Sequence, residues 1–230
     1  MSREALIVAH GQPSAPVPPE LWLMGFAKAV QDHLPGWNIR AATLAMPGAL
    51  ERQASEIAEG SQVFPMFMAD GWFVGKVLPK RLNGAPLTIL PPLGFDQNLP
   101  DFAANTVRDA LANRGWREPE SHLLVAAHGS ARGPKAAESA QAFRDALSKR
   151  FESLKITVGF VEEAPFIEQA ARGLPRQTLC LPFFALEGDH CREDIPEGLE
   201  KAAFSGDLLA PLGSWPQVAQ MVAHSLKTAR

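Results

Sequence analysis

The stretch "LLVAAHGSARGP", residues 123–134, begins with the apolar run "LLVAA", which is followed by a histidine and a glycine. The stretch "ALIVAHGQPSAP", residues 5–16, repeats this pattern and aligns His10 with His128, an offset of 118 residues. Short unbroken apolar runs are typical of parallel strands that are buried on both faces. The two stretches therefore predict the same first strand, followed by the same turn, in two halves of the chain.

Two further blocks align at nearly the same offset. "FPMFMADGWFVGKVLPKRL" (64–82) aligns with "LPFFALEGDHCREDIPEGL" (181–199) at an offset of 117. "PPLG" (91–94) aligns with "APLG" (210–213) at an offset of 119. A nearly constant offset over three separated blocks indicates an internal duplication.

Strand-like and helix-like stretches alternate within each half. "KITVGFVEE" and "RQTLCLPFFAL" predict strands, and "ESAQAFRDALSKRF" (138–151) predicts a helix because its apolar residues recur at helical spacing. We therefore expect an α/β fold of two three-layer α/β/α lobes, residues 1–116 and 117–230, joined near the polar stretch 113–121. Each lobe should hold a mostly parallel four-stranded sheet, in the order 2-1-3-4.

Composition excludes several classes of protein. The 230 residues are 46% hydrophobic and 20% charged with a net charge of -3, so no broad basic field is available to hold nucleic acid. No segment approaches the roughly 18 apolar residues of a membrane span, and the N-terminus lacks a signal-type pattern, so we expect a cytoplasmic protein without a membrane partner. Two cysteines are too few for an iron–sulfur cluster or a four-thiolate zinc site in one chain.

Ionisable residues follow the predicted strands of the C-terminal half. His128 ends the first strand, Glu162 and Glu163 end the second, and His190 follows the third. The carboxyl ends of parallel strands meet at one edge of a sheet, and neighbouring strands lie about 4.8 Å apart. Two imidazoles and a carboxylate are therefore expected to converge on one cation. Each histidine taken alone is equally well explained as a hydrogen-bonded residue in a turn.

The N-terminal half retains only part of this set. It keeps His10, but Phe73 stands where the second histidine is expected, and "TLAMP" (43–47) replaces the stretch with both glutamates. We infer that the C-terminal half carries the chemistry. Phe73, with Trp72 and Met68, is either an apolar wall for a large flat ligand or part of the core.

The stretches "LLVAAHGS", "VGFVEEAPFIEQA" and "LPFFALEGDHCREDIP" resemble the sirohydrochlorin cobaltochelatase family, the class II chelatases of cobalamin and sirohaem biosynthesis. The resemblance covers nearly all of residues 120–215 and is weaker in the N-terminal half. It implies a chelatase-like fold of two pseudo-twofold-related lobes around a cleft. It also implies insertion of a divalent metal ion, Co²⁺ first and Fe²⁺ or Ni²⁺ otherwise, into the tetrapyrrole sirohydrochlorin without an organic cofactor.

The resemblance also implies roles for residues. His128 and His190 would bind the metal ion and accept pyrrole protons, with Glu162 or Glu163 assisting, and His10 is a weaker candidate for a second site.

The carboxylates of sirohydrochlorin need hydrogen-bond donors. We expect these donors among the backbone amides of Gly129 and Ser130 and the cationic side chains of Arg132, Lys135 and Arg192. Phe73 is expected to contact the macrocycle.

The sequence also bears on three other functions. A metal or tetrapyrrole carrier derived from a chelatase stays open, because a site does not show turnover. A histidine phosphatase is disfavoured, since Ala127 and Ala9 stand where that chemistry needs an arginine. A hydrolase with Ser130 as nucleophile lacks the G-x-S-x-G turn.

Overall fold

The computed structural model describes residues 3–131 and 133–229 and divides them into two compact units. The first unit runs up to Asp96 and also includes the chain from Pro216 onward, and the second runs from Gln97 to Trp215. Each unit contains one four-stranded sheet in which all strands are parallel. The predicted α/β class is therefore confirmed.

The first unit is built on the strand order β2-β1-β3-β4. Its strands are β1 (Arg3–Ala9), β2 (Trp37–Thr43), β3 (Gln62–Pro65) and β4 (Thr88–Ile89). Its helices are α1 (Val17–Asp32), α2 (Ala49–Glu56), the π-helix η1 (Phe73–Val77), α3 (Leu78–Leu82), the 3-10 helix η2 (Leu93–Phe95) and α8 (Gln217–Thr228). The central strand β1 is an apolar run whose residues from Ala5 to Ala9 are fully buried.

The second unit repeats this order as β6-β5-β7-β8. Its strands are β5 (His122–Ala127), β6 (Lys155–Phe160), β7 (Thr178–Pro182) and β8 (Asp207–Leu208). Its helices are α4 (Leu99–Ala112), η3 (Glu118–Glu120), α5 (Lys135–Ser148), α6 (Ile167–Ala171), the π-helix η4 (His190–Asp194), α7 (Ile195–Lys201) and η5 (Leu212–Ser214). The order predicted from the sequence, 2-1-3-4, is confirmed in both sheets.

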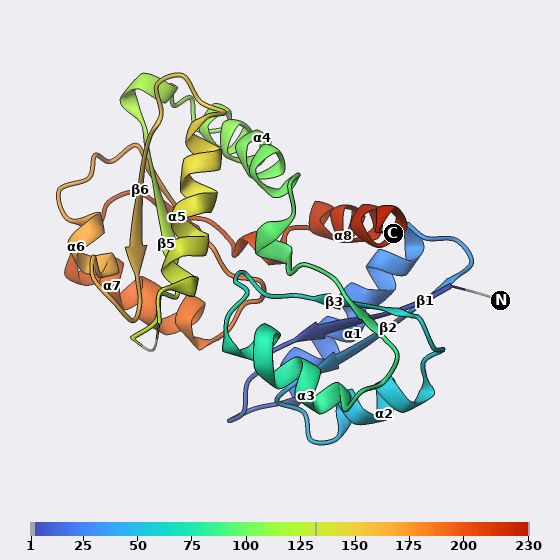
Figure 1. The fold of residues 1–230 in the computed structure, drawn as a ribbon. Coiled ribbons are helices and arrows are strands. Elements are labelled where there is room, and N and C mark those ends of the chain that lie inside the picture. Colours follow the sequence, from blue (N-terminus) through green and yellow to red (C-terminus); the bar gives the residue numbers. More distant parts are fainter. Residues whose placement is uncertain (1–2, 132, 230) are drawn as a thin grey trace. The chain divides into compact units, whose positions relative to one another are not determined.

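Helices flank each sheet because alternate strand residues face opposite sides. In the first unit, Leu6 and Val8 pack in one cluster with Leu50 of α2 and Leu78 of α3. In the second unit, Leu124 and Ala126 pack in the matching cluster with residues of α6 and α7. Helices α1 and α8 contact each other in the first unit, as α4 and α5 do in the second (Figure 1).

The two compact units differ from the expected lobes, residues 1–116 and 117–230, in the placement of two helices. Helix α4 follows β4 in the chain but belongs to the second unit, and α8 follows β8 but belongs to the first. An ion pair of 2.8 Å between Arg150 and Asp101 ties α4 to the end of α5, and the arginine lowers the pKa of that aspartate. Apolar periodicity shows that a helix has a buried face, but not which sheet buries it.

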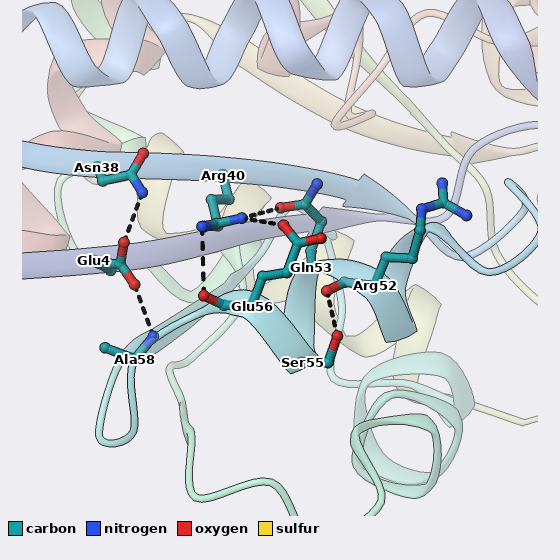
Figure 2. Close-up of polar contacts among 8 residues, drawn as sticks. All are labelled: Glu4, Asn38, Arg40, Arg52, Gln53, Ser55, Glu56 and Ala58. Carbon is teal, nitrogen blue, oxygen red and sulfur yellow. Dashed lines mark hydrogen bonds and ion pairs between the residues drawn. The ribbon is translucent and has the colours of Figure 1, made fainter.

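Polar contacts fasten α2 to the edge of the first sheet. The carboxylate of Glu4 accepts hydrogen bonds from the side chain of Asn38 at 2.6 Å and the backbone N–H of Ala58 at 2.7 Å (Figure 2). Arg40 on β2 pairs with Glu56 at the end of α2 at 2.9 Å. These charged groups therefore hold structural elements together. The residues expected to carry the chemistry lie in other parts of the chain.

Within the part of the chain that the structure describes, no helix is both long enough and apolar enough to span a bilayer.

Candidate metal centre

Three neighbouring strands of the second unit deliver three ionisable side chains to the same edge of the sheet. Strand β5 lies between β6 and β7. His128 directly follows β5, Glu162 follows β6 by two residues, and His190 begins η4 after β7. The backbone N–H of Glu162 donates to the carbonyl of His128 at 3.0 Å, which continues the β5–β6 pairing beyond the strands. Two of the three residues therefore lie at the ends of paired strands, and His190 begins the π-helix that follows β7.

The three side chains converge as the sequence predicts. One ligand atom from each of His128, Glu162 and His190 lies within 4.8 Å of the others. The two imidazole rings are 4.5 Å apart, measured between centroids, and stand nearly perpendicular at 84°. Metal–ligand bonds of about 2.0–2.2 Å place two ligand atoms up to about 4 Å apart, so small side-chain rotations suffice to enclose one divalent ion.

The cluster is open to solvent. The side chains of His128 and Glu162 are 41% and 44% exposed, and that of His190 is 38% exposed. A structural metal site would be closed by four protein ligands, whereas three ligands at an accessible edge leave coordination positions for water or a second molecule. The arrangement suits a metal ion that arrives and leaves.

Hydrogen bonds indicate which nitrogen of each histidine ring carries the hydrogen. Nδ1 of His128 lies 2.8 Å from the carbonyl oxygen of Gly129, and because a carbonyl only accepts, this nitrogen carries the hydrogen. Nδ1 of His190 lies 2.5 Å from Oδ2 of Asp194 and donates in the same way. In each neutral imidazole, Nε2 is then the nitrogen with the lone pair that a metal ion or a proton needs.

Asp194 is a side chain of this site that reasoning from the sequence missed. It lies four residues after His190 in the π-helix η4, whose i to i+5 hydrogen bond runs from the N–H of Ile195 to the carbonyl of His190. The available signal was this spacing, because residues four apart on a helical turn are neighbours.

The two glutamates have different partners. Glu162 belongs to the cluster with the histidines, and Glu163 does not. Oε1 of Glu163 instead accepts a hydrogen bond of 2.6 Å from the backbone N–H of Ser130. Glu163 therefore braces the turn after His128, and the Ser130 amide that we expected to receive a substrate carboxylate is engaged by a protein carboxylate.

Gly129 is required at this turn. Its φ of +68° lies in the left-handed region, and a Cβ atom there would meet the Glu163 side chain at 2.9 Å and Cβ of Phe160 at 3.0 Å. Its role in this structure is a close approach between the β5 and β6 ends.

Three cationic residues are expected near the substrate, and the structure describes two of them. Arg132 lies outside the residues that the structure describes. Lys135 begins α5 after the turn, and Arg192 lies within η4, where it is 3.7 Å from Glu187 with both side chains more than half exposed. A pair this exposed contributes little to stability.

The first unit has the same frame with different side chains. Nδ1 of His10 lies 2.8 Å from the carbonyl of Gly11, as at His128, and η1 begins at Phe73 as η4 begins at His190. The Phe73 ring packs edge-on against His10 at 4.2 Å. The backbone N–H of Ala45 donates to the His10 carbonyl, so Ala45, and not Leu44 as an ungapped alignment has it, is the counterpart of Glu162.

Among the described residues, the cluster of the second unit is the one group of three or more potential metal ligands. The ring of Trp72 in the first unit is exposed and lies 5.1 Å from that of Phe73.

Cys191 is next to His190 but points into the core. Its side chain packs with Ile195 and Leu199, and burial raises the pKa of the thiol to about 11. A protonated thiol is a poor metal ligand, so the interpretation of Cys191 as a packed side chain agrees with the structure.

Comparisons with known proteins agree with this architecture. A model of the CbiX family matches residues 122–229. The solved structure of CbiX, described as the terminal enzyme for biosynthesis of siroheme in denitrifying bacteria, is 43% identical and covers 99% of this chain and 100% of its own, with a TM-score of 0.90. A search of curated proteins found no match.

Two more distant structures share the fold. DR2241 from Deinococcus radiodurans, a multi-domain protein with structural similarity to chelatases, is 19% identical with a TM-score of 0.74 and covers 98% of this chain and 54% of its own. SirB from Bacillus subtilis, solved with Fe³⁺, is 15% identical with a TM-score of 0.71 and covers 99% and 95%. Together with an identity of 43% over nearly the full length of the CbiX structure, the repeated 2-1-3-4 sheets show that this chain belongs to the CbiX family.

Proposed function

We propose that this protein is a chelatase that inserts a divalent metal ion into sirohydrochlorin. The observation that carries the proposal is the convergence of His128, Glu162 and His190 at an open sheet edge, in a chain of the CbiX family. The metal ion is a substrate, held through Nε2 of the two histidines and a carboxylate oxygen of Glu162.

The chemistry of insertion matches these groups. Two pyrrole N–H protons have to leave the macrocycle as the metal–nitrogen bonds form. An imidazole that releases the metal ion regains its Nε2 lone pair and accepts one proton, so two histidines account for both. Imidazole suits this exchange near neutral pH, since its ordinary pKa is about 6.5.

The identity of the metal ion is a finer part of the proposal. The sequence resemblance favours Co²⁺, while the CbiX relative acts in siroheme synthesis, which favours Fe²⁺. Imidazole and carboxylate ligands accept cobalt, iron and nickel, so the ligand set fits each of them. The comparison of metals therefore belongs in the assay.

The test is spectroscopic. The purified protein is mixed with sirohydrochlorin and Co²⁺, Fe²⁺ (without oxygen) or Ni²⁺, and the visible absorption change is compared with the rate without protein. We expect acceleration that is lost in His128→Ala and His190→Ala and retained in His33→Ala, a matched control because that histidine is exposed and far along the chain from the cluster.

Two results would count against the proposal. Tight binding of metal or tetrapyrrole without acceleration by any metal ion would instead indicate a carrier protein. Full activity in both cluster variants would place the reaction elsewhere.

A further inference from the structure

The two histidines of the cluster differ in the group that holds the second ring nitrogen. Nδ1 of His128 donates to a neutral backbone carbonyl, and the carboxylate of Glu162 lies beyond hydrogen-bond distance of it at 3.8 Å. Nδ1 of His190 donates to the carboxylate of Asp194. We propose that Asp194 is a positioning residue that makes His190 the stronger of the two imidazole ligands, so that metal retention depends more on His190 than on His128. This inference rests on the proposed function, because it concerns the same metal ion.

The contact is short, and the residues next to it on the backbone are buried. The distance from Nδ1 of His190 to Oδ2 of Asp194 is 2.5 Å. The helix that carries both residues is anchored by Ile195, which is fully buried, and by Cys191, which is 8% exposed. The backbone that carries the pair is therefore held by buried neighbours of the core cluster.

The chemistry of the contact makes the ligands unequal. A carboxylate that accepts from Nδ1–H fixes the tautomer and the ring orientation, and it raises the basicity of Nε2. Charge-assisted hydrogen bonds are roughly twice as strong as those between neutral groups. His190 is therefore the better electron donor to a cation, while His128, held by a carbonyl, is the ligand that lets go more readily.

Comparison with the first unit indicates that Asp194 is not needed to form the π-helix η4. The π-helix η1 of the first unit has the same length as η4 and occupies the same place in the repeat, yet Phe73 stands for His190 and Val77 stands for Asp194. The carboxylate is thus absent in the copy that lacks the histidine. A structural requirement of the π-helix would have kept an equivalent polar group in both copies.

The experiment measures binding of Co²⁺ alone to the 230-residue protein by calorimetry and by the visible absorption of bound cobalt. We expect Asp194→Ala to weaken binding by about 10–100-fold, the usual effect of removing such a partner. Asp194→Asn should give a smaller loss, because the amide oxygen accepts the same hydrogen bond without the charge. His190→Ala should weaken binding more than His128→Ala.

Two variants serve as matched controls. Glu193→Gln removes one negative charge from the exposed surface of the same π-helix, and Val77→Ala truncates the corresponding position of the first unit. Both should bind Co²⁺ as the unmodified protein does. In the insertion assay, the Asp194 variants should raise the KM for the metal ion and leave the KM for sirohydrochlorin unchanged, which a general loss of structure would not do.

The outcomes are distinguishable. If the unmodified protein binds Co²⁺ and Asp194→Ala binds it equally well, the positioning role is wrong and the proposed function stands. A greater loss in His128→Ala than in His190→Ala would overturn the asymmetry. If the unmodified protein does not bind Co²⁺, the proposed metal site fails together with this inference.

Discussion

Replacing Gly129 with alanine should both destabilise the second unit and weaken the metal site. The left-handed conformation costs an alanine about 1–2 kcal/mol. The new Cβ would lie 2.9 Å from the side chain of Glu163, which then has to leave its hydrogen bond with Ser130. A hydrogen bond to a charged group contributes about 1.5–3 kcal/mol, so we expect a total loss of about 2.5–5 kcal/mol in the free energy of unfolding.

Gly173→Ala is the control that separates the two contributions. Gly173 has a φ of +74° in the same unit, but no atom lies within 4 Å of the position that its Cβ would take. It should lose only the conformational part, about 1–2 kcal/mol. Denaturant unfolding followed by circular dichroism measures both, and an equal loss in the two variants would refute the steric argument.

Gly11→Ala tests the link to the metal site. Its Cβ would meet the side chain of Thr43 at 2.8 Å, a clash like that at Gly129 but in the unit without the ligand cluster. We expect Gly11→Ala to lose stability and keep its affinity for Co²⁺, whereas Gly129→Ala loses both. Equal affinities in the two variants would show that the turn after His128 does not position the ligand.

Three other predictions address single groups. Glu162→Gln should weaken Co²⁺ binding roughly tenfold, or about 1.4 kcal/mol, without a loss of stability. Titration calorimetry measures the affinity, and the affinity of Glu163→Gln serves as the comparison. Cys191→Ala should keep the metal affinity. A thiol reagent at pH 7.5 should modify Cys191 far more slowly in the native protein than in the unfolded protein, because burial raises the pKa of the thiol to about 11. Burial, with a contribution from Lys155, lowers the pKa of His122, so its neutral form stabilises the fold above the unfolded pKa of about 6.5 and this stability is lost as the pH falls further. Unfolding midpoints between pH 7.5 and 5 should therefore fall less steeply in His122→Gln, and parallel pH profiles would contradict this.

Much of the fold was predictable because its signals are local and repeated. Two apolar runs that end at His10 and His128 predicted the central strands, and alternation with helical stretches predicted parallel sheets, as the structure has them. Convergence of His128 and His190 followed from the same topology, because neighbouring parallel strands end at one edge. The placement of α4 and α8 in the two units was not predictable, because apolar periodicity does not say which of two similar sheets buries a helix.

The sequence by itself determined the duplication, the α/β class and the strand ends at which the ionisable residues lie. Only the tertiary structure decided what each polar side chain contacts: Glu162 joins the histidines, Glu163 bonds to the Ser130 amide, and Asp194 holds His190. The physical reason is one of scale. Strand order follows from patterns over many residues. Which of two adjacent glutamates joins the histidines depends on a backbone register of a single residue, and the contact between His190 and Asp194 depends on the pitch of one helical turn.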